Sequence, residues 1–288
     1  MSVAQVRPSL ELVSRFCEVE RDETNRQLKA FHNFLPSPKS DKFVGACRSG
    51  TVDGTSEDYI EIYDIDPETY KISNVRSVCK GEDPRCFYFK GVPYAITWIM
   101  DFQGIAWNMD YRLINLLTGD VVVLDTSAIA HHCDPPKWVG KNWIPVERDG
   151  ELYFIMSFHP INALKCDVET GKITCDNFQQ YSVTEHRGGT PLIFSDVLNC
   201  YVGVGHRTYD GDTHAPYAYF VDKNLAEVKI SDDLLTPGTN NIGVNDPLSL
   251  YVYNGQMYCC IGWAPGHIAG CSPFRGFLYK LHLEVVNK

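Results

Sequence analysis

The sequence lacks any long apolar run, and no stretch approaches the roughly 20 residues that a membrane-spanning helix requires. Residues Met1 to Glu20 also lack the basic-then-apolar pattern of a signal peptide. We therefore expect a soluble, cytoplasmic protein without a membrane span. Basic residues are scarce too, because 26 Lys and Arg stand against 36 Asp and Glu, a formal net charge of −10. A protein that binds a nucleic-acid backbone needs a basic face, so nucleic acid is not an expected partner.

Paired metal-ligand spacings are also missing. The 11 cysteines are scattered, and the neighbours Cys259 and Cys260 are not expected to pair with each other. We expect mostly buried thiols in a reducing compartment. The segment His131-His132-Cys133-Asp134 has no second half of a zinc motif, so a polar loop is the prediction there. The sequence predicts neither a metal site nor a cofactor.

Helical periodicity is nearly absent. From about Lys42 onward, short β-branched and aromatic runs alternate with Gly, Pro, Asn and Asp, as in β proteins. Only the segment Pro8 to Glu20 suggests a helix, because Leu10, Val13 and Phe16 recur at helical spacing.

These patterns divide the chain into two parts. Residues 1–30 are expected to form a segment with a short helix, which packs on an edge or end of the main fold. Residues 31–288 are expected to form one all-β catalytic domain, and 44% hydrophobic residues over this length can bury its core.

An internal repeat organises the β region. Five segments that each read as strand, turn and strand begin near a proline: Pro36, Pro84, Pro145, Pro191 and Pro247. A second apolar–polar run follows each one, and the last, FLYKLHLEVV, alternates strictly from Phe277 to Val285. A period of roughly 50 residues with about four strands per unit predicts a five-bladed β-propeller. A β-sandwich with long loops is the structural alternative.

In a propeller, the first strands of all the blades converge on the central axis, where ligands are expected to bind. The residues at these positions are unusually polar: Asn33, Arg48, Glu82, Asp83, Arg85, Lys141, Asn142, His159, Arg187, Thr190, His206, Arg207, Asp246 and Trp263. Their cationic members suit a phosphate. Trp98, Trp143 and Trp263 fall near the same rim and could stack on a sugar, although Trp143 is equally expected in the core.

Asp83 is the candidate general acid. It lies in GEDPR, beside a second carboxylate and an arginine, and burial would raise its pKa toward the range that suits proton donation. An Asp-Pro turn is the simpler interpretation of the same residues.

Several of these motifs resemble a known family. EDPR followed by YFKGVPYAITW, KNWIP with LYFIMSFHP, and RGGTPLI with YVGVGHR are similar to motifs of the five-bladed β-mannoside phosphorylases and related β-1,2-mannosyltransferases. The resemblance implies inverting mannosyl transfer between a sugar phosphate or nucleotide sugar and a glycan acceptor, or the reverse phosphorolysis. Asp83 would protonate the glycosidic oxygen, directly or through a sugar hydroxyl.

The resemblance also implies roles for other residues. Asn33 and Arg48 would lie near the reactive sugar and phosphate, and Lys141 with Asn142 matches a basic-Asn pair. Arg187 and His206 fall near further matching positions. His159 stands where the family has an arginine, and the last blade lacks the family's acidic residue in CIGWAPGHIAG.

Two alternatives from other functional classes stay open. An inverting hydrolase would need a second carboxylate to activate water, and Glu185 is the candidate by its place in the sequence. A propeller that binds glycans without chemistry is the third hypothesis.

Overall fold

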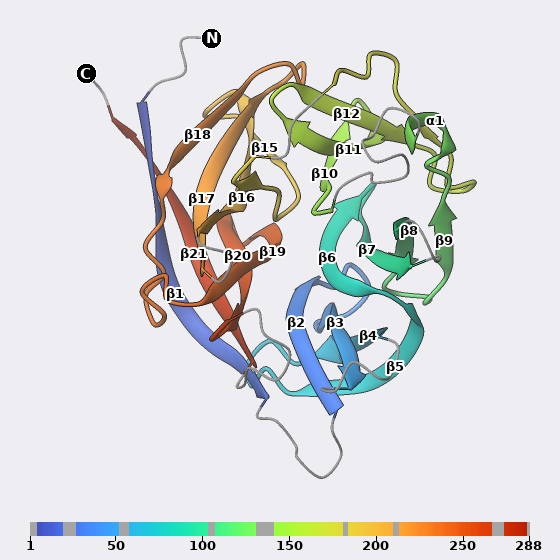
Figure 1. The fold of residues 1–288 in the computed structure, drawn as a ribbon. Coiled ribbons are helices and arrows are strands. Elements are labelled where there is room, and N and C mark those ends of the chain that lie inside the picture. The colour runs from blue at the N-terminus through green and yellow to red at the C-terminus, as the bar shows by residue number, and fades with distance from the viewer. Residues whose placement is uncertain are drawn as a thin grey trace.

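The computed structural model describes residues 5–19, 27–51, 58–102, 107–130, 141–180, 184–209, 213–266 and 274–286. Within them the chain forms five antiparallel sheets arranged in a ring, with the inner strands β2, β6, β10 and β19 around the centre (Figure 1). The predicted five-bladed propeller is therefore confirmed. We number the sheets blade 1 to blade 5 in chain order.

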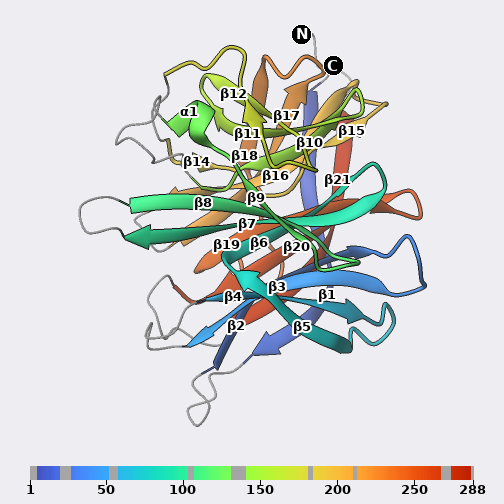
Figure 2. The same cartoon turned by 90° about the vertical axis from the view of Figure 1, so that its right-hand side faces the viewer.

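Each blade is a meander. Blade 1 consists of β2 (Gln27–Pro36), β3 (Phe43–Thr51), β4 (Tyr59–Ile65) and β5 (Ile72–Lys80). Blade 2 consists of β6 (Glu82–Phe89), β7 (Val92–Phe102), β8 (Trp107–Asn115) and β9 (Val121–Leu124). Blade 3 consists of β10 (Ile144–Arg148), β11 (Glu151–Phe158), β12 (Ile161–Cys166) and β13 (Ile173–Thr174). Figure 2 shows these three blades stacked one above the other.

The last two blades depart from this pattern. In blade 4 the inner strand is split into β14 (His186–Arg187) and β15 (Ile193–Ser195), which both pair with β16 (Cys200–Tyr209) and are followed by β17 (Thr213–Asp222) and β18 (Val228–Asp233). Blade 5 contains β19 (Val244–Tyr253), β20 (Gln256–Ala264) and β21 (Phe274–Val286), and β1 (Gln5–Val19) is its outer strand. The inner strand of blade 1 ends at Pro36, so this unit begins earlier than the proline pattern indicated.

The predicted N-terminal helix was wrong. The described part of Pro8 to Glu20 lies in strand β1, which pairs with β21 along the left edge of Figure 1. Two register shifts, between Leu12 and Ser14 and between Arg15 and Cys17, keep Leu10 and Phe16 on the buried side while Val13 is exposed. An open edge on β21 would leave backbone groups unpaired, so tertiary pairing prevails over the local helical spacing.

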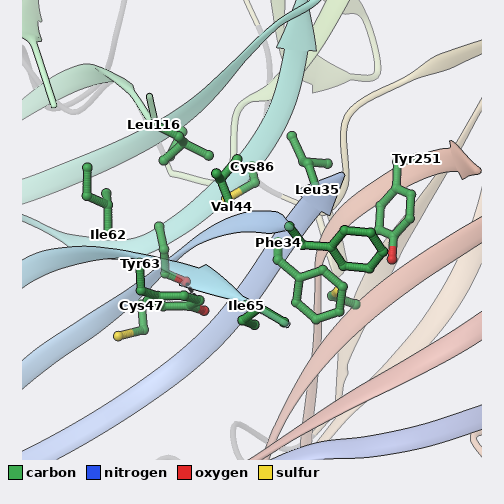
Figure 3. Close-up of a cluster of buried hydrophobic side chains, with 14 of the residues drawn as sticks. Phe34, Leu35, Val44, Cys47, Ile62, Tyr63, Ile65, Cys86, Leu116 and Tyr251 are labelled. Carbon is green, nitrogen blue, oxygen red and sulfur yellow. Dashed lines mark hydrogen bonds between the residues drawn. The ribbon is translucent and has the colours of Figure 1, made fainter. Parts of the chain in front are cut away.

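The blades are held together by apolar cores between neighbouring sheets. In the cluster of Figure 3, Phe34 of blade 1 faces Tyr251 of blade 5 with ring centroids 6.2 Å apart, and Cys86 of blade 2 joins them. The cysteines that are free thiols include Cys47, Cys79, Cys86, Cys166, Cys175, Cys200, Cys259 and Cys260. Helix α1 (Ser127–Ala130) has four residues, and no helix in the described chain is long and apolar enough to cross a membrane.

Candidate active site

Arg48 of β3 gathers three carboxylates beside the inner strand of blade 2. Its Nη1 lies 3.1 Å from Glu82 Oε2 and 3.2 Å from Asp83 Oδ1, and its Nη2 donates to Asp58 Oδ2 at 2.6 Å. The side chains are only partly exposed, between 13% for Asp83 and 24% for Arg48. We call Arg48, Asp58, Glu82 and Asp83 the Arg48 cluster. The sequence predicted Arg48, Glu82 and Asp83 as site residues, but not Asp58.

The backbone of EDPR is shaped to present these carboxylates. The pairing of β6 with β7 shifts register between Glu82 and Arg85, and Asp83 has a φ of 46° in the left-handed region. Such a bulge redirects side chains at the end of a strand. The Glu82 carbonyl accepts a 2.7 Å hydrogen bond from Thr97 Oγ1, which fixes the bulge. Gly81 precedes it because a Cβ there would lie 2.4 Å from that same hydroxyl oxygen.

The electrostatics of the cluster raise the pKa of one carboxyl, that of Glu82. Burial raises the pKa of Glu82 to about 6; Asp83 and Asp58 act in the same direction, while Arg48 and Lys141 oppose them. For Arg48, burial acts to lower the pKa, but the carboxylates of Asp83, Glu82 and Asp58 hold it above its ordinary value. Near neutral pH the cluster thus combines a fixed cation with a carboxyl that can release or take up a proton.

Arg85 crosses the centre of the ring. Its guanidinium is buried and donates to the carbonyl of Pro247 in blade 5 and, at 2.7 Å, to Oδ1 of Asn142 at the entry to blade 3. Burial lowers its pKa, although the carboxylates of Asp246 and Asp83 act to raise it. The predicted residues Arg85 and Asn142 are therefore brought together, as a bond between blades.

Asn33 has a positioning role in this structure. Its side chain is fully buried, its Nδ2 donates to the carbonyl of Pro84 at 2.9 Å, and its Oδ1 accepts from the Cys86 backbone N–H at 2.8 Å. Further bonds go to the carbonyls of Phe31 and Ala46. These contacts hold EDPR against blade 1, and both polar atoms of the Asn33 side chain take part in them.

The predicted rim residues separate into two groups. Lys141 is exposed and places its Nζ 5.1 Å from the centroid of Trp98, whose strand position is opposite Glu82. Trp263 is partly exposed and carries Arg275 over its ring at 4.9 Å. Trp143 is buried and stacks on Tyr111 at 3.8 Å, which resolves its two interpretations in favour of packing.

His206 and Asp246 meet in a second cluster on the inner side of blades 4 and 5. His206 Nδ1 is 3.5 Å from Asp246 Oδ1, and His214 Nδ1 is 2.5 Å from the same oxygen. The donor atoms of the three side chains lie within 4.8 Å of one another, and all three residues are buried. Of the described residues, these are the ones whose arrangement could hold a metal ion. Arg187 lies opposite His206 in the strand pairing, and its charge contributes to lowering the His206 pKa, which burial chiefly causes.

Arg207 and His159 are placed elsewhere. Arg207 donates to Asp233 Oδ1 and Tyr209 Oη, both at 2.9 Å, and lies 3.5 Å from Glu185 Oε1. Successive strand residues point to opposite faces, so Arg207 faces away from the side that His206 occupies. His159 lines an 810 Å³ groove between blades 3 and 4, together with Arg148 and Lys229.

Two residues of these clusters were not found from sequence. Asp58 lies outside the repeated motifs, just before β4, and is accommodated because Gly50 lacks a Cβ, which would lie 1.9 Å from its Oδ1. His214 lies on β17 and His206 on β16, so no ligand-type spacing signals it. The segment His131 to Asp134 lies outside the described residues.

Neither a protein-family model nor a curated protein sequence matches this chain. Solved structures do. A GH43 β-1,3-galactosidase in complex with galactodeoxynojirimycin has a TM-score of 0.58 at 12% identity, over 93% of this chain and 94% of that one. A mannose phosphorylase from Leishmania mexicana, in complex with phosphate ion, has a TM-score of 0.58 at 8% identity, over 93% and 88%.

A third similar structure is a GH43 β-xylosidase/α-arabinofuranosidase from a compost microbial metagenome in complex with xylotriose. Its TM-score is 0.58 at 10% identity, and the match covers 98% of this chain and 96% of that one. All three matches cover 93% or more of this chain. The comparisons thus establish the five-bladed propeller as the fold of this chain.

Proposed function

We propose that this chain is a carbohydrate-active enzyme that makes or breaks a glycosidic bond at the Arg48 cluster. The observation that carries the proposal is that one guanidinium nitrogen contacts both Glu82 and Asp83, and that the pKa of Glu82 is raised to about 6. Paired carboxyls in unlike environments are the machinery of glycosyl transfer, in which one donates a proton to the leaving oxygen. The likeness to propeller enzymes that act on sugars supports this reaction class.

Asp83 is the residue that the EDPR resemblance implies as the acid, and Glu82 is the carboxyl with a pKa suited to proton donation near neutrality. In our proposal Asp83 donates a proton to the glycosidic oxygen, directly or through a sugar hydroxyl. Glu82 can release or take up a proton beside it near neutral pH, and Arg48 fixes the position of both carboxyls. Lys141 is exposed and lies over the ring of the buried Trp98 beside this position, where it offers a cation to a sugar or its phosphate.

The finer proposal is inverting mannosyl transfer from a sugar phosphate or nucleotide sugar to a glycan acceptor. It is supported by EDPR and the strand after it, and by one phosphorylase among the similar structures. Because Arg48 already contacts three carboxylates and Arg85 is bonded to Pro247 and Asn142, an anionic phosphate would be bound chiefly through Lys141.

Hydrolysis is the second candidate, and the composition of the cluster favours it. Three carboxylates surround one arginine, so their combined charge disfavours an anionic phosphate and suits a neutral acceptor such as water. Glu185, the base considered from sequence, is exposed and pairs with Arg207, outside the Arg48 cluster. Within our proposal Asp58 is the better placed third carboxylate.

The experiment is a mass-spectrometric assay with mannose 1-phosphate or GDP-mannose plus mannose and short manno-oligosaccharides, and in parallel with nitrophenyl glycosides in water. For transfer, we expect chain elongation that is lost in Asp83→Asn. Lys141→Ala should raise the KM for the donor in the same assay. Release of the free sugar, unaffected by Lys141→Ala, would assign hydrolysis instead. No turnover of any donor, with sugar binding still visible as a thermal shift, would refute catalysis and leave a glycan-binding propeller.

A further inference from the structure

We propose that His206, His214 and Asp246 form a binding site for a divalent transition-metal ion, with Zn²⁺ as its probe, which fastens blade 4 to blade 5. The three side chains come from three strands, β16, β17 and β19, and their donor atoms lie within 4.8 Å of one another. This site is independent of the Arg48 cluster and of the proposed reaction.

The backbone brings the two histidines together. His206 pairs with Pro216 and His214 with Thr208, so the histidines are diagonal neighbours on one face of the β16–β17 hairpin. Their rings stack with centroids 4.3 Å apart and an interplanar angle of 18°. The backbone N–H of His214 donates to the carbonyl of Gly243 at 3.0 Å, which ties the hairpin to the start of blade 5. Asp246 follows three residues later and reaches back to both rings.

Hydrogen bonding alone leaves this cluster incomplete. His214 Nδ1 forms a hydrogen bond of 2.5 Å with Asp246 Oδ1. His206 Nδ1 is buried and faces the same oxygen at 3.5 Å, yet it has no hydrogen-bond partner. A buried polar atom without a partner is destabilising, and a cation between the three donors would satisfy it.

The donor set selects the class of ion. Two imidazoles and one carboxylate suit Zn²⁺ and its first-row neighbours, whereas Ca²⁺ takes six to eight oxygen ligands. The Nη atoms of Arg85 are bonded to the Pro247 carbonyl and to Asn142 Oδ1.

The test begins with the full chain, stripped with EDTA and titrated with Zn²⁺. We expect one equivalent to bind, and a rise in Tm of roughly 5–10 °C when free Zn²⁺ is a hundredfold above Kd. Co²⁺ in place of Zn²⁺ should give a saturable visible absorption spectrum with the same stoichiometry. No saturable binding of either ion, with an unchanged Tm, would overturn the site.

Variants locate the ion. His214→Gln and Asp246→Asn should each weaken Zn²⁺ binding by more than about 100-fold, beyond the loss that follows removal of an outer-shell partner. His282→Ala is the matched control. His282 also contacts a carboxylate, Glu11 at 2.7 Å, but this pair is exposed and has no second histidine. Unchanged Zn²⁺ affinity in both cluster variants would refute the assignment. If those variants fail to fold, the Co²⁺ titration of the unaltered chain decides.

Discussion

Glu82→Gln should stabilise the folded protein above pH 6. Glutamine keeps the shape of the side chain but has no charge to bury, whereas the folded structure raises the pKa of Glu82 from 4.5 to about 6. At about 1.4 kcal/mol per pKa unit, this rise corresponds to about 2 kcal/mol of lost stability when the carboxyl is ionised. The side chain is only 22% exposed, so solvent screening reduces the figure little.

The pH dependence follows from the sign of the shift. A group whose pKa is raised on folding favours the folded state below its unfolded pKa, and this contribution is lost as the pH rises through the folded value. At pH 4.5, the free energy of unfolding of Glu82→Gln should therefore be only slightly higher than that of the unaltered chain. The difference should grow to about 2 kcal/mol by pH 7 and then stay constant.

Urea unfolding followed by tryptophan fluorescence at pH 5, 6, 7 and 8 measures this difference. Glu185→Gln is the control, because its carboxylate is exposed and its exchange should leave the pH profile unchanged. A Glu82→Gln protein that is less stable than the unaltered chain at pH 8 would refute the reasoning. That result would mean that the 3.1 Å contact with Arg48 stabilises the folded protein by more than the burial of the Glu82 charge destabilises it.

Four further substitutions test the assignments of single residues. Asp83→Asn should abolish turnover while sugar binding, measured by thermal shift, is retained; full activity would remove Asp83 from the mechanism. Glu185→Gln should keep the catalytic rate within about twofold in a turnover assay, since surface changes away from a site are usually mild, and a loss of hydrolysis would restore it as the base. Trp143→Ala should lower stability in urea by about 3–5 kcal/mol because it removes the ring stacked on Tyr111; a change in KM alone would contradict the packing role. Asn33→Ala should lower stability by about 1–3 kcal/mol, since the Cys86 N–H and the Pro84 carbonyl lose a buried partner, and unchanged urea unfolding would contradict its positioning role.

The sequence by itself determined the repeated strand units and the location of the acid motif. Alternation and turn residues are local properties, and the second half of every unit was found in the strands that the structure contains. The alternation of the last strand correctly placed Phe277, Tyr279 and Leu281 on a buried face, whereas Val285, predicted on the same face, is exposed. EDPR was recognisable because its carboxylates and arginine are contiguous.

Only the tertiary structure decided which residues meet across the ring. Asp58 and His214 belong to no motif. Asp58 meets Arg48 between adjacent strands of blade 1, and His214 of blade 4 meets Asp246 of blade 5. Arg207 was expected beside His206, but adjacent residues of a strand face different blades. The segment at Leu10 and Phe16 became a strand since the open edge of β21 needed a partner. Ring closure joins segments that are distant in sequence, and a local pattern carries no information about such partners.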